Sequence, residues 1–228
     1  MYLPYVSDLC EILVPRRCAS CGCRLLPSEG ALCMRCVAAL PRVRHWNHGN
    51  PAEHRLFGRL AFGHGASFCF YLRDSAWADL LKKAKYGGCP WVNSELARLV
   101  AAELTEWPYD ADVIVPIPIH WFRRLRRGYN QTEYIARTLG KCWHLPVETR
   151  SLVKSTYTSS QVGNSYDQRL ARMEGTFSVR HPERLEGRHL LLVDDVLTSG
   201  ATLIACGQAL QHTVPNVRIS FLTLGMVP

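Results

Sequence analysis

Helical and strand patterns alternate along the last two thirds of the chain. Apolar residues recur at helical spacing over residues 75–85 and 94–106, and Asn93 or Ser94 is expected to cap the second helix. Further helices are predicted over 131–141 and from about Gly200 to Gln211, and strands over 112–118, 147–154, 189–193 and 217–224. The unbroken apolar run in 189–193 indicates a strand buried on both faces. This alternation predicts an α/β fold, with a parallel sheet flanked by helices.

The stretch between Lys154 and Phe177 departs from this alternation. It has few large aliphatic residues and many Ser, Thr, Gly, Asn and Arg, which predicts a long loop with one helical turn near 166–173. Loops of this length in compact domains are commonly functional, so we interpret residues 155–175, approximately, as a flexible lid over a binding cleft. The alternative interpretation is an insertion that the fold tolerates.

The first sixty or so residues are rich in Cys, Arg and turn formers. Two C-x2-C pairs are separated by eleven residues, and their members are Cys18, Cys21, Cys33 and Cys36. Two facing turns of this kind supply the four thiolates that tetrahedral Zn²⁺ prefers, which favours a closed, structural zinc site. Cys23, His45 or His48 are alternative ligands, and reduced buried cysteines are the alternative to zinc. We predict a zinc-binding module over 1–62 and a second domain over 63–228.

Composition limits the class of protein. Hydrophobic residues make up 47% and charged residues 20% of the 228, which suffices for a buried core and excludes a disordered or collagen-like chain. No apolar run reaches the roughly 18 residues of a membrane span, and Asp8 and Glu11 interrupt the opening segment, so we expect a cytoplasmic protein without membrane insertion. The net charge of +8 suits an anionic partner, either nucleic acid or a phosphorylated metabolite.

The segment LLLVDDVLTSGAT, residues 190–202, carries the most specific chemistry. Ligands of open α/β sheets bind beyond the carboxyl ends of strands, where Asp194 and Asp195 are expected to hold ribose hydroxyls directly or through Mg²⁺. The following turn and helix offer backbone N–H groups, hydroxyls and a positive helix end to a phosphate. The expected phosphate-binding residues are Leu197, Thr198, Ser199, Gly200, Ala201 and Thr202.

This segment resembles the ribose-phosphate motif of type I phosphoribosyltransferases. Together with the four-cysteine module, LKKAKYGG at 81–88, PIPIHWFRRLRRGYNQTE at 116–133 and TSSQ at 158–161, it resembles the ComF family over nearly the whole chain. RRGYNQ, residues 126–131, is the most specific marker of that resemblance. One departure lies in the loop, where Arg172 stands at a position that is Asn in similar proteins.

The resemblance implies a type I phosphoribosyltransferase-like domain that binds phosphoribosyl pyrophosphate and Mg²⁺. Asp194 and Asp195 would be the catalytic and Mg²⁺-binding carboxylates that favour a cation-like anomeric carbon. The expected pyrophosphate-binding residues are Arg123, Arg127, Lys82 and Lys85, and the expected lid residues are Thr158, Ser160, Gln161 and Arg169. The alternative for the Arg run is a solvated basic face. No motif identifies the acceptor of the phosphoribosyl group.

The resemblance also implies a role in DNA uptake and natural transformation, with single-stranded DNA and DNA-uptake proteins as partners. The competing hypothesis is a non-catalytic protein that binds single-stranded DNA, and a weaker one is a sensor of the sugar phosphate. Arginines of the module interleave with aromatic residues that would offer stacking faces: Trp46, Phe57, Phe62, Phe68, Phe70, Tyr71 and Trp77. The alternative for this mixture is ordinary surface and core.

Overall fold

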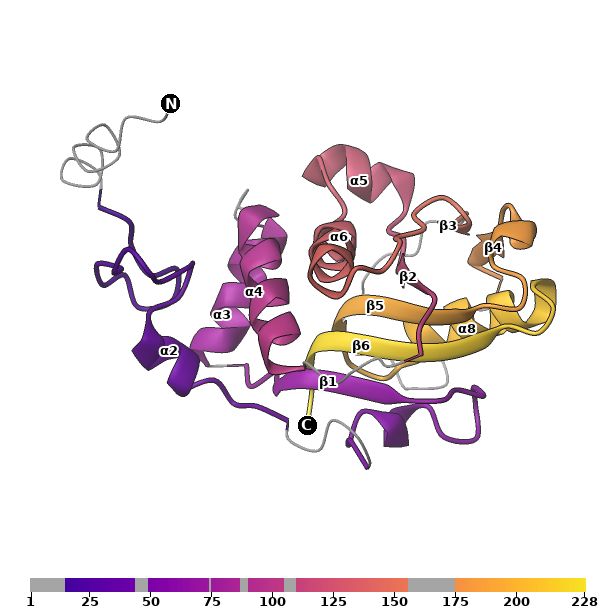
Figure 1. Cartoon of the computed structure of the whole chain (residues 1–228), viewed down its shortest axis with the longest axis horizontal. Coiled ribbons are helices and arrows are strands. Elements are labelled where there is room, and N and C mark those ends of the chain that lie inside the picture. The colour runs from indigo at the N-terminus through magenta and orange to yellow at the C-terminus, as the bar shows by residue number, and fades with distance from the viewer. Residues whose placement is uncertain (1–14, 44–48, 74, 87–89, 105–109, 156–174) are drawn as a thin grey trace.

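A four-stranded parallel sheet forms the centre of the structure, a computed structural model that describes residues 15–43, 49–73, 75–86, 90–104, 110–155 and 175–228 (Figure 1). The strands follow the order β1 (Gly65–Phe70), β6 (Arg218–Met226), β5 (His189–Leu197) and β2 (Val113–Pro116). Leu190 of β5 lies in register with Val113 of β2 and Ile219 of β6. The predicted α/β fold class is therefore confirmed.

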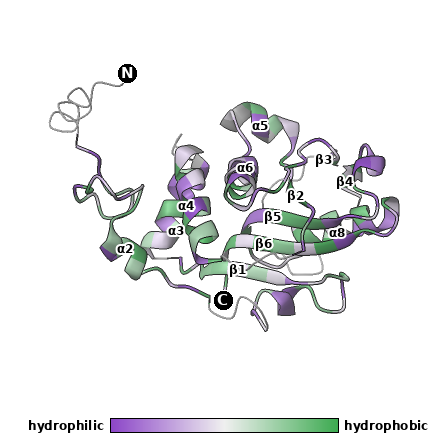
Figure 2. Cartoon of the chain, in the orientation of Figure 1, coloured by the Kyte–Doolittle hydropathy of each residue, from purple (hydrophilic) through white to green (hydrophobic). Residues whose placement is uncertain are grey.

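Helices cover both faces of this sheet. They are α3 (Ala76–Tyr86), α4 (Pro90–Glu103), α5 (Trp121–Arg127), α6 (Gln131–Trp143) and α8 (Ala201–Thr213), with the short α2 (Met34–Ala38) and the 3₁₀ turns η1 (Glu53–Arg55) and η2 (Pro182–Arg184). Leu191 and Val193 of β5 enter the core shared with α3, α4 and α6, whereas Leu190 and Leu192 enter the core shared with α8. Figure 2 shows hydrophobic residues concentrated along the central strands. Burial on both faces explains the unbroken apolar run in β5.

Several predicted elements have different bounds or partners. Helix α4 begins at Pro90, so the predicted cap at Asn93 or Ser94 is wrong. Asn93 is instead buried within α4, and its Nδ2 donates a 3.2 Å hydrogen bond to the carbonyl of Ala84 in α3. Strand β3 (Leu152–Lys154) covers only the end of the predicted 147–154 and pairs with β4 (Phe177–Val179) in a separate antiparallel ribbon. Strands β1 and β4 and helix α5 were not predicted.

The cysteine-bearing segment joins the sheet through residues 41–43 and 52–60. The backbone N–H of Val43 donates to the carbonyl of Phe68 in β1, and the N–H of Phe70 donates to the carbonyl of Pro41. Leu56 and Leu60 belong to the same core as α8. Residues before 62 thus contribute to the core of the sheet, and the division of the chain at residue 62 stays a prediction. Over the described ranges, no helix is both long and apolar enough to cross a membrane.

Candidate functional site

The four predicted zinc ligands come together in the structure. The Sγ atoms of Cys18, Cys21, Cys33 and Cys36 all lie within 4.8 Å of one another. Gly22 adopts a left-handed conformation, with φ of +73°, and its N–H donates to the carbonyl of Cys18, which closes the first turn. Hydrogen bonds, first from the backbone of Cys23, lower the pKa of the Cys21 thiol to about 6 and favour its thiolate. The cluster is compatible with a tetrahedral zinc site closed by four protein ligands.

Cys23 lies beside this cluster as a fifth thiol. Hydrogen bonds with Cys21 and then Cys33 raise the pKa of the Cys23 thiol to about 12. The distances favour Cys18, Cys21, Cys33 and Cys36 as the ligand set, because their Sγ atoms lie within 4.8 Å of one another and that group does not include Cys23. The other alternative ligands, His45 and His48, lie outside the described residues.

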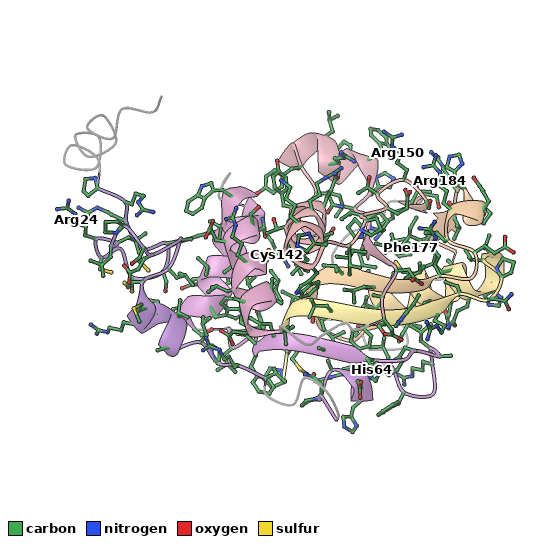
Figure 3. All side chains as sticks on the ribbon, viewed as in Figure 1. Arg24, His64, Cys142, Arg150, Phe177 and Arg184 are labelled. Atoms are coloured by element: carbon green, nitrogen blue, oxygen red, sulfur yellow. The ribbon has the colours of Figure 1, made fainter. Side chains whose placement is uncertain are left out.

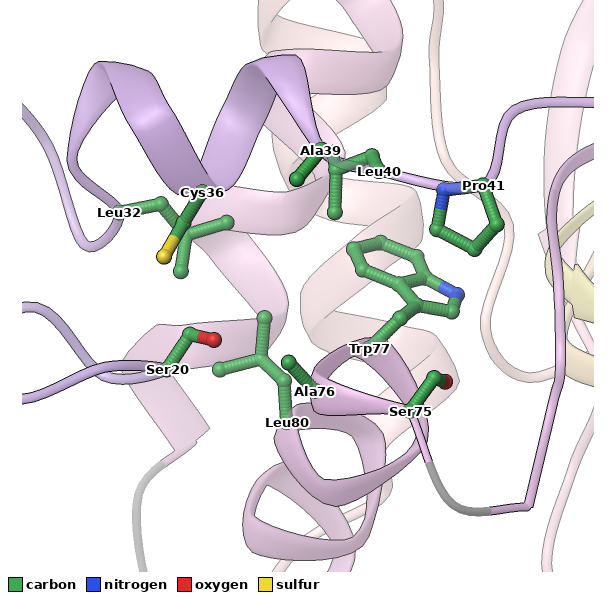
Figure 4. A pocket seen from close by; sticks show the side chains of 10 residues that line it. All are labelled: Ser20, Leu32, Cys36, Ala39, Leu40, Pro41, Ser75, Ala76, Trp77 and Leu80. Carbon is green, nitrogen blue, oxygen red and sulfur yellow. The ribbon is translucent and has the colours of Figure 1, made fainter.

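The cysteine module rests on helices α3 and α4. Lys83 of α3 donates from Nζ to the carbonyl of Ala19, between the first two cysteines, at 2.9 Å. Arg42 forms two hydrogen bonds of 2.6 Å with the carboxylate of Glu103 at the end of α4. Figure 4 shows Trp77 of α3 facing the segment Ala39–Pro41 across a small cavity, with the thiol of Cys36 at the opposite side. The same helix that supports the module also reaches the carboxylates of β5.

Asp194 and Asp195 lie in the second half of β5, which continues to Leu197 rather than ending at residue 193 as predicted. The Asp195 carboxylate forms an ion pair with Lys85 of α3 at 3.0 Å and accepts a 3.0 Å hydrogen bond from Nε2 of Gln131 in α6. Asp194 accepts a 2.8 Å hydrogen bond from the backbone N–H of Asp195. These contacts satisfy both carboxylates at the end of a buried strand.

The two neighbouring carboxylates differ in their electrostatic surroundings. Burial raises the pKa of Asp194 to about 7, and the negative charge of Asp195 adds to this effect. The positive charges of Lys85 and of Lys154 in β3 act in the opposite direction. Asp194 is thus a carboxyl group that ionises near neutral pH, while Asp195 is held in an ion pair with Lys85.

The predicted phosphate-binding turn forms a small concavity after β5. Asp194, Leu197, Thr198, Gly200, Ala201 and Thr202 line it, together with Val196 and Leu203. Gly200 has φ of +80° and directly precedes α8, and within the described residues no side chain caps the N-terminus of this helix. A Cβ atom on Gly200 would lie 3.2 Å from Cδ1 of Leu56 and 3.3 Å from the carbonyl oxygen of Arg55. The start of α8 and Asp194 thus line the same concavity, and the first N–H groups of a helix have no partner within the helix.

The RRGYNQ segment lies between α5 and α6, and it also contacts α3 and Asp195. Gly128, with φ of +79°, ends α5. The hydroxyl of Tyr129 donates to the carbonyl of Ala84 at 2.8 Å, and Asn130 caps α6 by accepting from the N–H of Thr132. Gln131 then contacts Asp195. The sequence interpretation assigned only arginines of this region to ligand binding and missed the roles of Tyr129, Asn130 and Gln131 as positioning residues, although the marker motif contains all three.

The remaining predicted site residues have varied surroundings. Lys82 is exposed and forms a 3.1 Å ion pair with Asp79, one turn before Lys85 on α3. Arg123 and Arg127 lie in α5, but their side chains lie outside the described part of the chain. Residues 156–174 of the predicted lid, which include Thr158, Ser160, Gln161, Arg169 and the helical turn predicted near 166–173, also lie outside the described residues. Lys154, whose charge acts on Asp194, was not singled out from the sequence.

Most of the aromatic residues proposed as a stacking face near the cysteine module lie in or against a hydrophobic core, including Tyr71, which is partly buried. Phe68 and Trp77 are 0% and 2% exposed and belong to the core under α3 and α4. Phe62 and Phe70 pack against the opposite core, whereas Phe57 is exposed. Trp46 lies outside the described residues. The interpretation of this set as core is thereby confirmed for Phe68 and Trp77.

Comparison with known proteins relates the chain to bacterial competence proteins, although no family model matches it. It is 31% identical over 160 residues to competence protein ComFC of Bacillus subtilis, which covers 68% of this chain and 61% of that protein. It is 30% identical over 130 residues to competence protein F of Haemophilus influenzae, which covers 54% and 57%. The chain is a homologue of these competence proteins. The resemblance to the ComF family is therefore confirmed.

A further relative and two solved structures are also similar to parts of the chain. DNA utilization protein YhgH of Escherichia coli K12 is 28% identical over 138 residues, which cover 58% of this chain and 60% of that protein. The chain thus matches about six tenths of the length of these relatives. A glutamine phosphoribosylpyrophosphate amidotransferase from B. subtilis is similar with a TM-score of 0.37 and 18% identity, covering 57% of this chain and 25% of that one. An adenine phosphoribosyltransferase gives 0.38 and 12%, covering 62% and 71%.

Proposed function

We propose that this protein takes part in the uptake or handling of DNA and that the carboxyl end of β5 binds phosphoribosyl pyrophosphate with Mg²⁺. The names of its homologues support the first part. The second part rests mainly on one observation, which is that only five residues separate the Asp194–Asp195 pair from a helix whose N-terminus carries no side-chain cap among the described residues. A sugar phosphate needs carboxylates for its ribose hydroxyls and, close to them, backbone N–H groups for its phosphate.

The turn from Leu197 to Thr202 would hold the 5′-phosphate. The N–H groups at the start of α8 donate to phosphate oxygens, and the helix dipole favours a dianion there. Thr198, Ser199 and Thr202 add hydroxyl donors from the same turn. Gly200 is needed because its backbone is left-handed and its neighbours leave no room for a longer side chain.

The two carboxylates would hold the ribose hydroxyls and Mg²⁺. Carboxylate oxygens fit Mg²⁺, which when bound would stabilise the charge of a leaving pyrophosphate. Lys85, which lies 3.0 Å from Asp195, would exchange this ion pair for a pyrophosphate oxygen, with Lys82, Arg123 and Arg127 as further cationic candidates. Asp194 must lose its proton before it can act as an anionic ligand, so binding is expected to strengthen as the pH rises through about 7.

The corresponding reaction would be transfer of the phosphoribosyl group. The bond from the anomeric carbon to pyrophosphate breaks, a nucleophile of the acceptor forms the new bond, and pyrophosphate leaves with the electron pair. The negative charges of Asp194 and Asp195 would favour the cation-like anomeric carbon. The zinc module over the first 62 residues would be structural, because four protein ligands leave no open position on the metal. The acceptor stays unassigned.

Calorimetric titration with phosphoribosyl pyrophosphate, with and without Mg²⁺, tests this proposal. We expect saturable binding to the wild-type protein in the presence of Mg²⁺ and its loss in Asp195→Asn. Glu95→Gln is a matched control, because Glu95 also forms an ion pair within its own helix, with Arg98 of α4, and neither residue belongs to the proposed site. The absence of binding by a folded, zinc-loaded wild-type protein would overturn the donor site and favour a non-catalytic DNA-binding protein.

A further inference from the structure

Helix α5 exposes large apolar side chains to solvent. Trp121, Phe122 and Leu125 are 65%, 46% and 75% exposed, and Tyr134 on the adjoining α6 is 39% exposed. The rings of Trp121 and Phe122 stand at 89° to one another, with centroids 5.9 Å apart. Exposed aromatic faces on a helix so rich in charge are unusual for a surface without a partner. They point to an interaction surface.

Arginines lie close to these aromatic residues in the sequence. The sequence places four arginines within residues 123–127. Among the described side chains, Arg124 and Arg137 both form ion pairs with Glu133, at 3.5 Å and 2.8 Å. The two guanidinium groups and the one carboxylate together carry a net charge of +1. Because Arg124 is 62% exposed at its side chain, water access to its guanidinium is retained.

A polar groove lies between α5 and α6. Its volume is about 270 Å³, and its lining includes Arg124, Tyr129, Asn130, Glu133, Tyr134 and Arg137. The rings of Tyr129 and Tyr134 meet edge to face, with centroids 5.6 Å apart. The groove therefore offers aromatic faces, amide and hydroxyl groups and guanidinium groups within one concavity.

We propose that α5 and the first half of α6 form a binding surface for single-stranded DNA, with Trp121, Phe122 and Tyr134 stacking on bases and Arg124 and Arg137 contacting phosphates. Aromatic stacking tolerates any base, and arginine contacts to the backbone are independent of sequence. An apolar, cationic helix also suits an anionic membrane surface. The polar lining of the groove favours the nucleic acid, because its amide, hydroxyl and guanidinium groups would lose hydration in a lipid interface.

This surface rests on the proposed role in DNA handling but not on the donor site. It also differs from the basic and aromatic set near the cysteine module, of which Phe68 and Trp77 are buried. The two sites adjoin, because Tyr129 and Asn130 line the groove and Gln131 contacts Asp195. Each site can nevertheless be tested alone, since Trp121 and Asp195 belong to different contacts.

Fluorescence anisotropy tests the surface by measuring the Kd for a labelled oligothymidylate. An oligonucleotide of about 20 nucleotides is longer than one site of this kind requires. Trp121→Ala is expected to raise the Kd about tenfold, the effect of one lost stacking contact. Trp91→Ala removes a similarly exposed tryptophan from α4 and should change the Kd by less than about twofold. Arg137→Gln should make the salt dependence of log Kd shallower by about one unit of slope, as expected for one lost phosphate contact.

The outcomes separate this surface from the donor site and from a membrane surface. Equal Kd values for wild type, Trp121→Ala and Trp91→Ala would overturn the surface, whatever the titration with phosphoribosyl pyrophosphate shows. Weakened DNA binding in Trp121→Ala, with no binding of phosphoribosyl pyrophosphate by wild type, would support the surface and reject the donor site. Binding to phosphatidylglycerol vesicles that Trp121→Ala abolishes, with unchanged affinity for the oligonucleotide, would overturn DNA as the partner.

Discussion

Replacement of Asp194 by Asn should change how the stability of the protein depends on pH. Burial raises the pKa of Asp194 to about 7 in the folded state, against an ordinary value of 3.8. Between these values the folded state holds a proton that the unfolded state has released, so the free energy of unfolding falls as the pH rises from about 4 to about 7. Asn does not ionise, and its Oδ1 can still accept the hydrogen bond from the N–H of Asp195.

The magnitude follows from the difference between the two pKa values. A difference of about three units corresponds to about 4 kcal/mol of destabilisation of the wild type above pH 7, and most of it develops between pH 5 and pH 8. We expect the stability of Asp194→Asn relative to wild type to increase by about 2–3 kcal/mol over that interval. The change with pH is more informative than the absolute difference, because any packing effect of Asn is the same at each pH.

Urea unfolding at several pH values between 5 and 8 measures this difference, in zinc-loaded protein without Mg²⁺ or phosphate ligands. Asp79→Asn is the control, since its exposed ion pair with Lys82 should contribute less than about 0.5 kcal/mol at any pH. Parallel pH profiles for wild type and Asp194→Asn would refute the reasoning, because they would mean that Asp194 is ionised throughout and that its burial is not costly.

Three further changes test other parts of the structure. Cys33→Ser should abolish stoichiometric zinc, measured by elemental analysis, whereas the exposed Cys142→Ser on α6 (Figure 3) should not; a soluble Cys33→Ser protein with full zinc would mean that the ligand set is wrong. Arg42→Leu should lower the free energy of unfolding by about 1–3 kcal/mol, because Glu103 loses both hydrogen bonds. The control Arg98→Leu, which breaks a surface ion pair with Glu95, should lower it by about 0.5 kcal/mol or less. Equal losses in urea unfolding would contradict a stabilising contact between the module and α4. Gly200→Ala should cost more stability than Gly58→Ala, since both have positive φ but only Gly200 has close neighbours, and a smaller loss at Gly200 in thermal unfolding would disprove the tight approach.

The sequence predicted the elements whose hydrophobic pattern matches a buried face. The LLLV run of β5 and the spaced apolar residues of α6 are examples, because each fills a core on the predicted side. Helix α5 was missed for the opposite reason, since its apolar residues Trp121 and Leu125 are exposed and define no buried stripe. Strand β1 was missed because Gly65 weakens the strand pattern. A Cβ atom at Gly65 would lie 2.1 Å from the ring of Phe221, which explains why glycine fits there.

The candidate site was predicted in outline but not in its connections. A motif places Asp194, Asp195 and Gly200 on one strand and turn, since they are close in the sequence. The contacts of Asp195 with Lys85 and Gln131 join residues 110 and 64 positions away, so they depend on tertiary packing that no local pattern encodes. The same contacts explain why β5 extends past residue 193, because a charged residue can remain in a buried strand when its charge is paired.

Anomalous diffraction from crystals grown with Mn²⁺, as a substitute for Mg²⁺, and phosphoribosyl pyrophosphate would test the two sites together. A zinc signal is expected among Cys18, Cys21, Cys33 and Cys36, and a manganese signal beside Asp194 and Asp195 with a phosphate at the start of α8. Zinc in the module without manganese or sugar phosphate at β5, in crystals whose lattice leaves that edge open, would contradict the proposed donor site.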